Sequence, residues 1–257
     1  MYPLIFGILD SYSVMLVVGF VLALTVLFIY LRKQKLSRNE IIDILICGIV
    51  AIAFGIIFAI LFQNAYDLIY YGENYKWTWG MTFYGGVFGG IAGFVLMYNL
   101  YYLRFHNSAI KHLLIVAPGC ITLAHSVGRI GCFLDGCCYG RETNSWIGIV
   151  FPVLNDGIKR IPTQLIESIF LLILSVVLLI LIFKNVTYQT FPIYMISYST
   201  FRFIIEYFRG DYRGKIILGM SPSQIWCVIL FLLAPAVFIL LKKVIFKETN
   251  KNEKTNS

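Results

Sequence analysis

Seven long apolar stretches constrain this chain more than any other feature of its sequence. Each is close to the roughly 20 residues that an α-helix needs to cross the hydrocarbon core of a bilayer. They run over residues 14–31, 41–62, 81–103, 110–127, 165–183, 191–208 and 224–241. The sequence therefore predicts an all-α polytopic membrane protein with seven transmembrane helices. Its composition agrees, because 59% of the residues are hydrophobic and only 13% are charged, which excludes an ordinary soluble domain.

Basic residues predict how these helices are oriented. Four of them directly follow the first apolar stretch: Arg32, Lys33, Lys35 and Arg38. Because cytoplasmic loops carry an excess of lysine and arginine, we expect the N-terminus outside and the C-terminus in the cytoplasm. The predicted organisation is one seven-span membrane domain over 1–245, with an outer-face segment at 128–163 and a polar cytoplasmic tail over 246–257.

Ionisable residues inside the apolar stretches are the first candidates for function, since a charge at membrane depth is costly. Arg202, Glu206 and Arg209 follow one another at i, i+4 and i+7, which is one face of a helix. Two guanidinium groups to one carboxylate leave a surplus positive charge that suits a phospholipid head group, although a structural polar seam is the alternative. His125, near the end of the fourth stretch, and Arg129, just after it, lie one turn apart if the helix continues that far, and packing and function are both open interpretations of this pair.

Glycine and cap residues mark two further features. Glycines recur at four-residue spacing on the third stretch: Gly85, Gly86, Gly89, Gly90 and Gly93. This bare strip predicts close helix packing, or a groove for an acyl chain with Tyr84 as a hydrogen-bond donor to the head group. Ser221 and Gln224 predict a capping box at the start of the last helix.

The six cysteines fall into two groups. Cys47, Cys120 and Cys227 lie inside apolar stretches and are expected to be small buried hydrophobic residues. Three others lie close together in one polar segment: Cys132, Cys137 and Cys138. The sequence leaves three interpretations of this second group open, namely structural or disulfide-bonded cysteines, a zinc site that also uses His125, and a nucleophilic thiol.

Five short motifs follow one another on the third to seventh apolar stretches. They are FYGG at 83–86, GRIGCFLDGCCYG at 128–140, PTQLIE at 162–167, FRFIIEYFRGD at 201–211 and MSPSQ at 220–224. The second resembles G-R-x-G-N-F-x-N-G-E-x-x-G, the signature of the prolipoprotein diacylglyceryl transferase family. The other four resemble that family's FHGG, PSQLYE, FRxxxEFFRxPD and MGQ elements. Together the motifs extend the resemblance over most of the chain.

The resemblance implies a reaction and a location. It implies a multi-pass enzyme of the bacterial plasma membrane whose active site faces the outer leaflet. This enzyme transfers the diacylglyceryl group of phosphatidylglycerol to the lipobox cysteine thiol of prolipoproteins and releases glycerol phosphate. The implied partners are phosphatidylglycerol, the lipobox peptide and membrane lipids, with no nucleic acid. No cofactor is implied, and no metal is assigned to the site.

The resemblance also suggests roles for individual residues. Arg129 and Arg202 match two arginines of the family motifs and are expected to hold the phosphate, with His125 or Tyr84 assisting proton transfer. The residues expected to bind lipid are Arg129, Arg202, Gly85, Gly86, Gly136 and Arg209. The residues expected to organise the site around them are Glu206, Gln164, Glu167, Cys132 and Cys137.

The chain departs from the family pattern at four positions. It has Cys132 and Asp135 for two asparagines, Cys137 for a glutamate and Tyr84 for a histidine. The group that removes the thiol proton is therefore open, with two alternatives: His125, one turn before Arg129, replaces the missing base, or Cys132, Cys137 and Cys138 carry new chemistry. Two other functions also remain open: glyceryl transfer to a different acceptor, and phospholipid binding or transport without chemistry.

Overall fold

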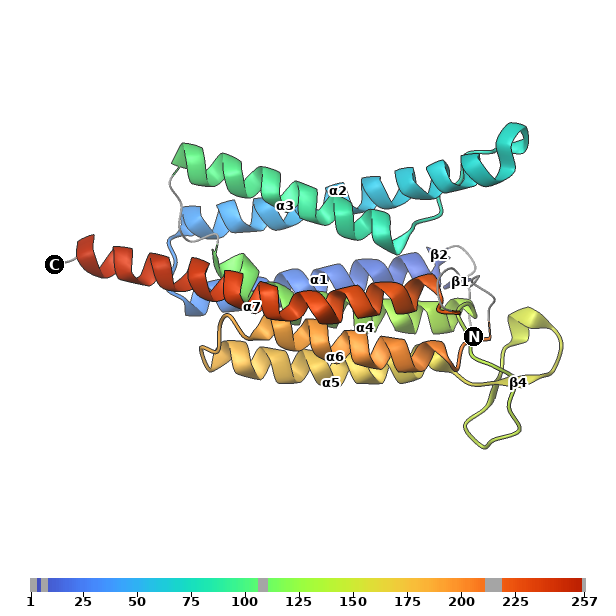
Figure 1. Cartoon of the computed structure of the whole chain (residues 1–257). Helices are drawn as coiled ribbons and strands as arrows, with labels where there is room; N and C mark the ends of the chain where they lie inside the picture. Colours follow the sequence, from blue (N-terminus) through green and yellow to red (C-terminus); the bar gives the residue numbers. More distant parts are fainter. Residues whose placement is uncertain (1–3, 6–8, 106–110, 211–218, 256–257) are drawn as a thin grey trace. The chain divides into compact units, whose positions relative to one another are not determined.

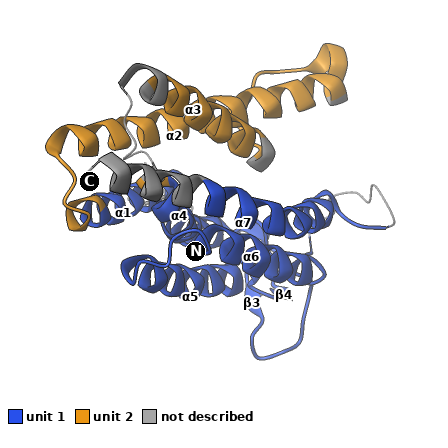
Figure 2. Cartoon of the chain, turned by 60° about the vertical axis from the view of Figure 1, so that its left-hand side comes forward, with its two compact units in different colours: residues 1–30, 114–257 blue, residues 31–113 orange. Residues whose placement is uncertain are grey.

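The computed structural model describes residues 4–5, 9–105, 111–210 and 219–255 (Figure 1). The chain forms two compact units, which are coloured separately in Figure 2. One unit comprises Met1–Tyr30 and Leu114–Ser257, and the other comprises Leu31–Leu113. We describe each unit by itself.

Seven α-helices form most of the described chain. They are α1 (Ser11–Lys33), α2 (Arg38–Tyr71), α3 (Phe83–Phe105), α4 (Lys111–Asp135), α5 (Thr163–Phe183), α6 (Thr190–Glu206) and α7 (Pro222–Thr255). Each coincides with one predicted apolar stretch, so the helical prediction is confirmed. Five of them, α1, α2, α4, α5 and α7, are long and apolar enough to cross a membrane. The chain is therefore a helical membrane protein, and the count of seven spans stays a prediction.

Three helix boundaries differ from the prediction. Helix α4 passes through Pro118 and continues to Asp135, so residues 128–135 of the predicted outer segment are helical. Helix α6 ends at Glu206, before the predicted end, because residues 207–209 turn out of the helix with hydrogen bonds to carbonyls three residues back. Helix α7 continues beyond its apolar part to Thr255, where the sequence predicted a separate polar tail.

The smaller unit consists mainly of α2 and α3. Ser37 and Glu40 form a capping box that begins α2, with the Ser37 backbone N–H donating to Glu40 Oε2 at 2.8 Å. The glycine strip of α3 lies against this helix. A Cβ atom on Gly89 would lie 2.4 Å from the carbonyl oxygen of Phe54, and one on Gly85 would lie 2.5 Å from that of Phe58. The predicted packing role of these glycines is confirmed.

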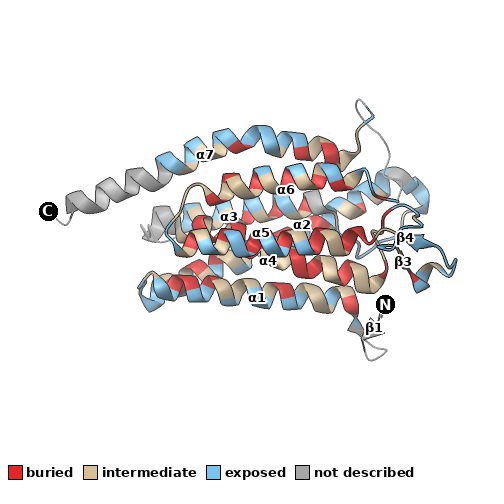
Figure 3. Cartoon of the chain, turned by 90° about the horizontal axis from the view of Figure 1, so that it is seen from below, coloured by how far each residue is buried: buried red, intermediate tan, exposed pale blue. Residues whose placement is uncertain are grey.

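The larger unit is a bundle of α4, α5, α6, α7 and most of α1. The buried residues of α5 lie on one face, and the apolar ones form a core with Tyr198 of α6: Leu171, Leu174 and Leu178. Figure 3 shows this buried face along the helix. Towards the start of α5 the same face becomes polar, with Gln164 and Glu167 both 1% exposed. The polar functional candidates of α5 therefore lie at one end of the bundle.

Helices α4 and α5 pack closely through small polar residues. Ser126 and Ser168 each donate a hydrogen bond to the other's carbonyl oxygen at 2.9 Å, and Ser175 donates to the carbonyl oxygen of Gly119 at 3.1 Å. Such exchanges satisfy polar groups between membrane helices while allowing the backbones to approach. They fix the position of α4 relative to α5.

Two small antiparallel pairs of strands complete the described chain. Strand β1 (Leu4–Ile5) pairs with β2 (Leu9–Asp10), and β3 (Ile149–Val150) pairs with β4 (Lys159–Arg160). Short 3-10 helices, η1 (Gly72–Asn74) and η3 (Pro152–Leu154), lie in the connections. The β3–β4 pair follows α4 and precedes α5, so it extends from the end of the bundle that carries the polar residues (Figure 1).

Candidate functional site

A tight turn ends α4 and begins the candidate site. The Gly136 N–H donates to the carbonyl oxygen of Phe133 at 3.2 Å, and the Cys137 N–H donates to that of Cys132 at 3.1 Å. With Gly136 at a φ of 80°, this is a Schellman motif, in which glycine is favoured because the left-handed backbone strains a residue with a side chain. Gly136 thus allows the left-handed turn that ends α4 directly after Asp135.

The chain after this turn is hydrogen-bonded to the residues just before α5 and just after α6. The Gly140 N–H donates to the carbonyl oxygen of Ile161 at 2.8 Å, and the Arg141 N–H donates to that of Phe208 at 2.9 Å. A Cβ atom on Gly140 would lie 2.7 Å from the Phe208 oxygen and 2.8 Å from the Ile161 oxygen. Only glycine fits without displacing backbone, so Gly140 holds together the ends of three helices.

Glu167 of α5 is the centre of a buried charged cluster. Its Oε2 lies 3.0 Å from Nε of Arg129 on α4 and 3.6 Å from Nη1 of Arg202 on α6. Its Oε1 accepts a hydrogen bond from the Tyr198 hydroxyl at 3.0 Å and lies 3.9 Å from Nε2 of His125. Arg129, Glu167 and Arg202, which come from three separate sequence motifs, therefore meet in one cluster.

A second carboxylate connects this cluster to α7. Glu206 Oε2 lies 2.8 Å from Nη2 of Arg202, and Glu206 Oε1 accepts a hydrogen bond from the Ser221 hydroxyl at 2.8 Å. Ser221 and Gln224 also form the predicted capping box, in which the Ser221 N–H donates to Gln224 Oε1 at 3.0 Å. Arg202 thus bridges Glu167 and Glu206.

The charge of the cluster differs from the prediction. The sequence assigned Arg202, Glu206 and Arg209 to one helical face with a surplus positive charge. Because α6 ends at Glu206, Arg209 is not on that face: its backbone pairs with Gly140 in an isolated β-bridge. Glu167 also enters the cluster, so two arginines face two carboxylates.

The arginines keep donor atoms without hydrogen bonds to the described residues. Arg129 Nε and Arg202 Nη1 are both buried, and both lie near Glu167 Oε2 without hydrogen-bond geometry. Buried donors of this kind are uncommon in folded proteins, where the large majority have partners. Two guanidinium groups that converge on one point in this way suit an oxyanion such as phosphate.

The second cysteine group lies at the turn beside this cluster. The Sγ atoms of Cys132, Cys137 and Cys138 lie within 4.8 Å of one another. Gln164 Nε2 donates to the carbonyl oxygen of Cys137, and Thr163 Oγ1 donates to that of Cys138 at 2.9 Å. Gln164 therefore supports the turn, and its role in organising the site stays a prediction.

The thiols of this group interact with one another and with an arginine. Hydrogen bonds from the Cys132 and Cys137 thiols, followed by the charge of the Arg209 guanidinium, lower the pKa of Cys138 below its usual range. Cys132 and Cys137 are free thiols in the structure, so the disulfide interpretation is not realised there. The three cysteines of the first group, Cys47, Cys120 and Cys227, are buried among apolar residues as predicted.

Three predicted site residues belong to the smaller unit. Gly85 and Gly86 lie in the first turn of α3, where Gly85 packs on α2. Tyr84 precedes them in the same helix, and its side chain lies outside the described residues. The acyl-groove interpretation of these positions therefore stays a prediction.

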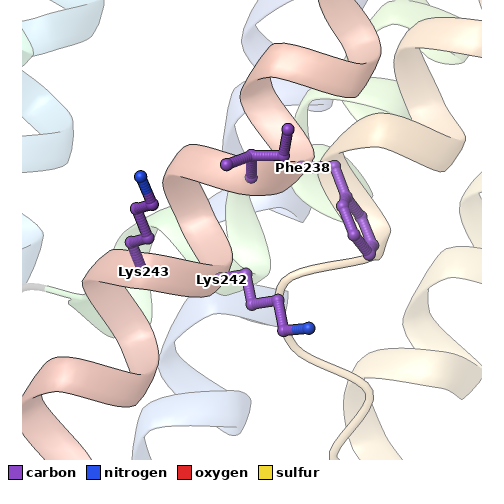
Figure 4. Close-up of a pocket in the computed structure, with 4 residues that line it drawn as sticks. Phe238, Lys242 and Lys243 are labelled. Atoms are coloured by element: carbon purple, nitrogen blue, oxygen red, sulfur yellow. The ribbon is translucent and has the colours of Figure 1, made fainter.

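A hollow on α7 offers different chemistry. It is lined by Phe238, Ile239, Lys242 and Lys243, and Figure 4 shows the two ammonium groups directed away from each other. None of these four residues supplies a carboxylate, a thiol or a guanidinium. The site with reactive groups is therefore the cluster at the opposite end of the helix, where Gln224 lies.

The family follows from comparison with known proteins. A family model described as "Prolipoprotein diacylglyceryl transferase" matches residues 4–240. The chain belongs to this family.

Named relatives agree with this family. The chain is 38% identical over 176 residues to phosphatidylglycerol–prolipoprotein diacylglyceryl transferase 2 of Clostridium perfringens, a match that covers 67% of this chain and 63% of that protein. It is 31% identical over 241 residues to the phosphatidylglycerol–prolipoprotein diacylglyceryl transferase of Clostridium tetani, covering 91% and 94%. The Dehalococcoides mccartyi (strain 195) transferase is 31% identical over 249 residues, covering 94% and 92%. The chain is therefore a transferase of the prolipoprotein diacylglyceryl transferase family.

Two residues of this transferase are more central than the sequence indicated. Glu167 was expected to lie around the lipid-binding residues and to organise them, yet it lies between Arg129 and Arg202 and pairs with both. Tyr198 was not selected at all, although it lies four residues before Arg202 and therefore on the same helical face. A search for polar residues at i±4 from each buried arginine finds it.

Proposed function

We propose that the protein transfers the diacylglyceryl group of phosphatidylglycerol to the lipobox cysteine thiol of prolipoproteins and releases glycerol phosphate. Arg129 and Arg202 hold the phosphate of the lipid. Glu167 and Glu206 position the two arginines, and Tyr198 positions Glu167. Family membership supports the reaction, and the buried cluster supports these roles.

The convergence of Arg129 and Arg202 on one carboxylate oxygen carries this proposal. The side chain of Arg129 is 15% exposed and that of Arg202 is 8% exposed. Charge–charge interactions are stronger at such a site than in water because the surroundings screen them less. A phosphate oxygen that enters beside Glu167 receives donors from both arginines.

The chemistry of the leaving group suits two fixed positive charges. Breaking the bond between the glyceryl carbon and the phosphate oxygen converts a phosphodiester with one negative charge into glycerol phosphate with two. Preorganised donors stabilise the transition state because the charge grows towards them as the bond breaks. Glu167 prevents the arginines from repelling each other before the lipid binds.

His125 is the proposed acceptor of the thiol proton. It lies on α4 one turn before Arg129, and its ring contacts Tyr198 edge to face at a centroid distance of 5.2 Å. A thiol must lose its proton before it attacks, and an imidazole accepts protons near neutral pH. Tyr84 is the alternative donor or acceptor from α3.

The location of the protein is proposed from the same features. We place it in the bacterial plasma membrane with seven spans, its N-terminus outside and its cysteine-rich turn at the outer leaflet. Lys242 and Lys243, at the far end of α7 from Gln224, support a cytoplasmic position for that end. Gly85 and Gly86 of α3 and Arg209 are proposed to contact the lipid.

A product assay tests this function. Purified protein in detergent is incubated with phosphatidylglycerol carrying labelled acyl chains and with a lipobox peptide. The proposal predicts a thioether-linked diacylglyceryl peptide, identified by mass spectrometry, and equal release of glycerol phosphate. A peptide with serine in place of the cysteine is the matched control and is expected to remain unmodified.

Other outcomes correspond to the two remaining functions. An adduct on a different thiol or alcohol, with no modified lipobox peptide, would indicate a transferase with another acceptor. Lipid bound at Arg129 and Arg202 without any product would indicate a phospholipid-binding protein. Either result contradicts the proposed reaction.

A further inference from the structure

We propose that Cys132, Cys137 and Cys138 bind one zinc ion, whose fourth coordination position receives the acceptor thiol. The role of the thiol rests on the proposed function, whereas the binding of zinc does not. Zinc binding is inferred from three sulfur atoms that lie within 4.8 Å of one another at the turn that ends α4.

The backbone explains why these sulfurs meet. In a Schellman motif, the backbone N–H of the second residue after the helix end donates a hydrogen bond to the carbonyl oxygen of the third residue before the helix end. The side chains of these two residues are commonly in contact. Here those positions are Cys137 and Cys132, as the hydrogen bond from the Cys137 N–H to the Cys132 oxygen shows. Cys138 follows in a left-handed conformation, with a φ of 63°. A spacing that matches no common zinc motif is thus brought together by the turn.

The distances suit zinc after a small closure. A Zn–S bond of about 2.3 Å in tetrahedral geometry requires sulfur atoms roughly 3.8 Å apart. The described sulfurs lie within 4.8 Å of one another, so none has to move by more than about 1 Å towards its neighbours. Rotation about the cysteine χ1 bonds supplies such a movement.

The donor set favours zinc with an open position. Thiolates are soft ligands that select zinc and similar cations over magnesium or calcium. The described residues add no histidine, carboxylate or fourth cysteine to the group. His125, the fourth ligand that the sequence suggested, lies instead beside Glu167. Three protein ligands with a vacant fourth position are typical of catalytic zinc sites, whereas structural sites have four.

Two arginines balance the charge of such a centre. Zinc with three thiolates carries one net negative charge. Arg209 hydrogen-bonds to Cys138, and Arg129 is close enough to Cys132 and Cys138 to interact with them electrostatically. Cys137 and Cys138 are partly exposed while Cys132 is buried, so an incoming thiol can approach from the side of Cys137 and Cys138.

The zinc gives the acceptor thiol its reactive form. When the thiol coordinates, its S–H bond breaks, the sulfur keeps the electron pair, and the proton passes to His125, the acceptor proposed above, because a metal-bound thiol is deprotonated outright. The thiolate then attacks the glyceryl carbon of phosphatidylglycerol. A C–S bond forms, the C–O bond to phosphate breaks, and glycerol phosphate leaves with the electron pair of the broken C–O bond.

The arrangement brings both reactants together. Arg129 and Cys132 lie on the same helix three residues apart, about 4.5 Å along its axis. The lipid phosphate at Arg129 and the thiol at the zinc are therefore neighbours. Cys132 and Cys137 are also two of the positions where the signature departs from its family, so the proposal assigns these substitutions one common purpose.

Metal binding is tested on the full-length protein in detergent. The reduced protein is loaded with Zn²⁺, passed through a desalting column, and its metal content is measured. We expect one tightly held zinc per chain and, after replacement by Co²⁺, a sulfur-to-cobalt charge-transfer absorption band. Cys132→Ser, Cys137→Ser and Cys138→Ser should each lose the band, whereas the control Cys227→Ala, in a buried apolar position, should retain it. Two results on the wild-type protein alone would overturn the proposal. The first is that no zinc is retained, and the second is that a disulfide joins Cys132 and Cys137 under reducing conditions.

Thiol binding is tested by spectroscopy and activity together. Adding the lipobox peptide to the cobalt protein should change the ligand-field absorption, whereas the serine peptide should not. Removing zinc with a chelator should lower the transfer rate at least tenfold, and added zinc should restore it. Full transfer activity in zinc-free protein refutes the zinc role but leaves the proposed function intact. Zinc and peptide binding without any product refutes the proposed function but leaves the metal site intact.

Discussion

Replacing Glu167 with glutamine removes the negative charge that Arg129 and Arg202 share while keeping the size of the side chain. Glu167 is 1% exposed, with guanidinium nitrogens 3.0 and 3.6 Å from one of its oxygens. Removing one partner of a buried ion pair costs about 3–5 kcal/mol, because the remaining charge stays buried without compensation. Glu206 still pairs with Arg202, so most of this cost arises at Arg129.

The assay is thermal unfolding in a neutral detergent. For a chain of this size, 1 kcal/mol corresponds to a shift of roughly 2–4 °C in Tm, so we expect Glu167→Gln to unfold roughly 6–20 °C below the wild type. Glu142→Gln is the matched control, since Glu142 is 65% exposed and lies 3.5 Å from Arg160. That surface pair should contribute no more than about 1 kcal/mol.

Anionic lipid provides a second readout of the same variant. If the arginines bind phosphate, phosphatidylglycerol should raise the Tm of Glu167→Gln more than that of the wild type, because it replaces the missing charge. A zwitterionic lipid should stabilise both proteins equally. Equal Tm values for Glu167→Gln and Glu142→Gln would refute the central role of this carboxylate.

Three further changes test the surroundings of the cluster. Gly140→Ala should destabilise the protein by about 1–3 kcal/mol, because the new Cβ lies within 2.8 Å of two backbone oxygens. The control Gly128→Ala, whose Cβ would lie 3.6 Å from Leu16, should have little effect. Denaturation of both variants measures the two losses of stability, and equal losses would contradict the prediction. Tyr198→Phe removes the hydrogen bond to Glu167 and should cost about 1.5–3 kcal/mol, measured by unfolding against a Tyr207→Phe control. His125→Asn should lower kcat by about 10²-fold or more if His125 accepts the thiol proton, and unchanged lipidation would exclude that role.

The sequence predicted the helices well because each apolar stretch is long and continuous. It also selected Arg129, Arg202, Glu206 and Gln164, since polar residues in apolar surroundings are conspicuous. The predicted end of the fourth helix was wrong, because α4 extends to Asp135, where a glycine turn and not a change of polarity ends it.

Long-range contacts could not be predicted from spacing. Arg129 and Glu167 are 38 positions apart, and only the packing of α4 on α5 brings them together. The placement of Arg209 was wrong because helical spacing was extended past the residue where the helix ends. The meeting of the three sulfurs likewise depends on left-handed backbone at Gly136 and Cys138, which the spacing alone does not reveal.

The central claim is that Arg129 and Arg202 act on one phosphate, and a double-mutant cycle on kcat/KM for phosphatidylglycerol tests it most directly. Lysine retains the charge at each position but cannot bind an oxyanion with a planar pair of donors. We expect Arg129→Lys and Arg202→Lys each to lower kcat/KM by about 10²–10³-fold, and the double variant to be little worse than either, because residues that act as a unit are not additive. Losses that multiply in the double variant, or single variants with wild-type kcat/KM, would contradict the claim.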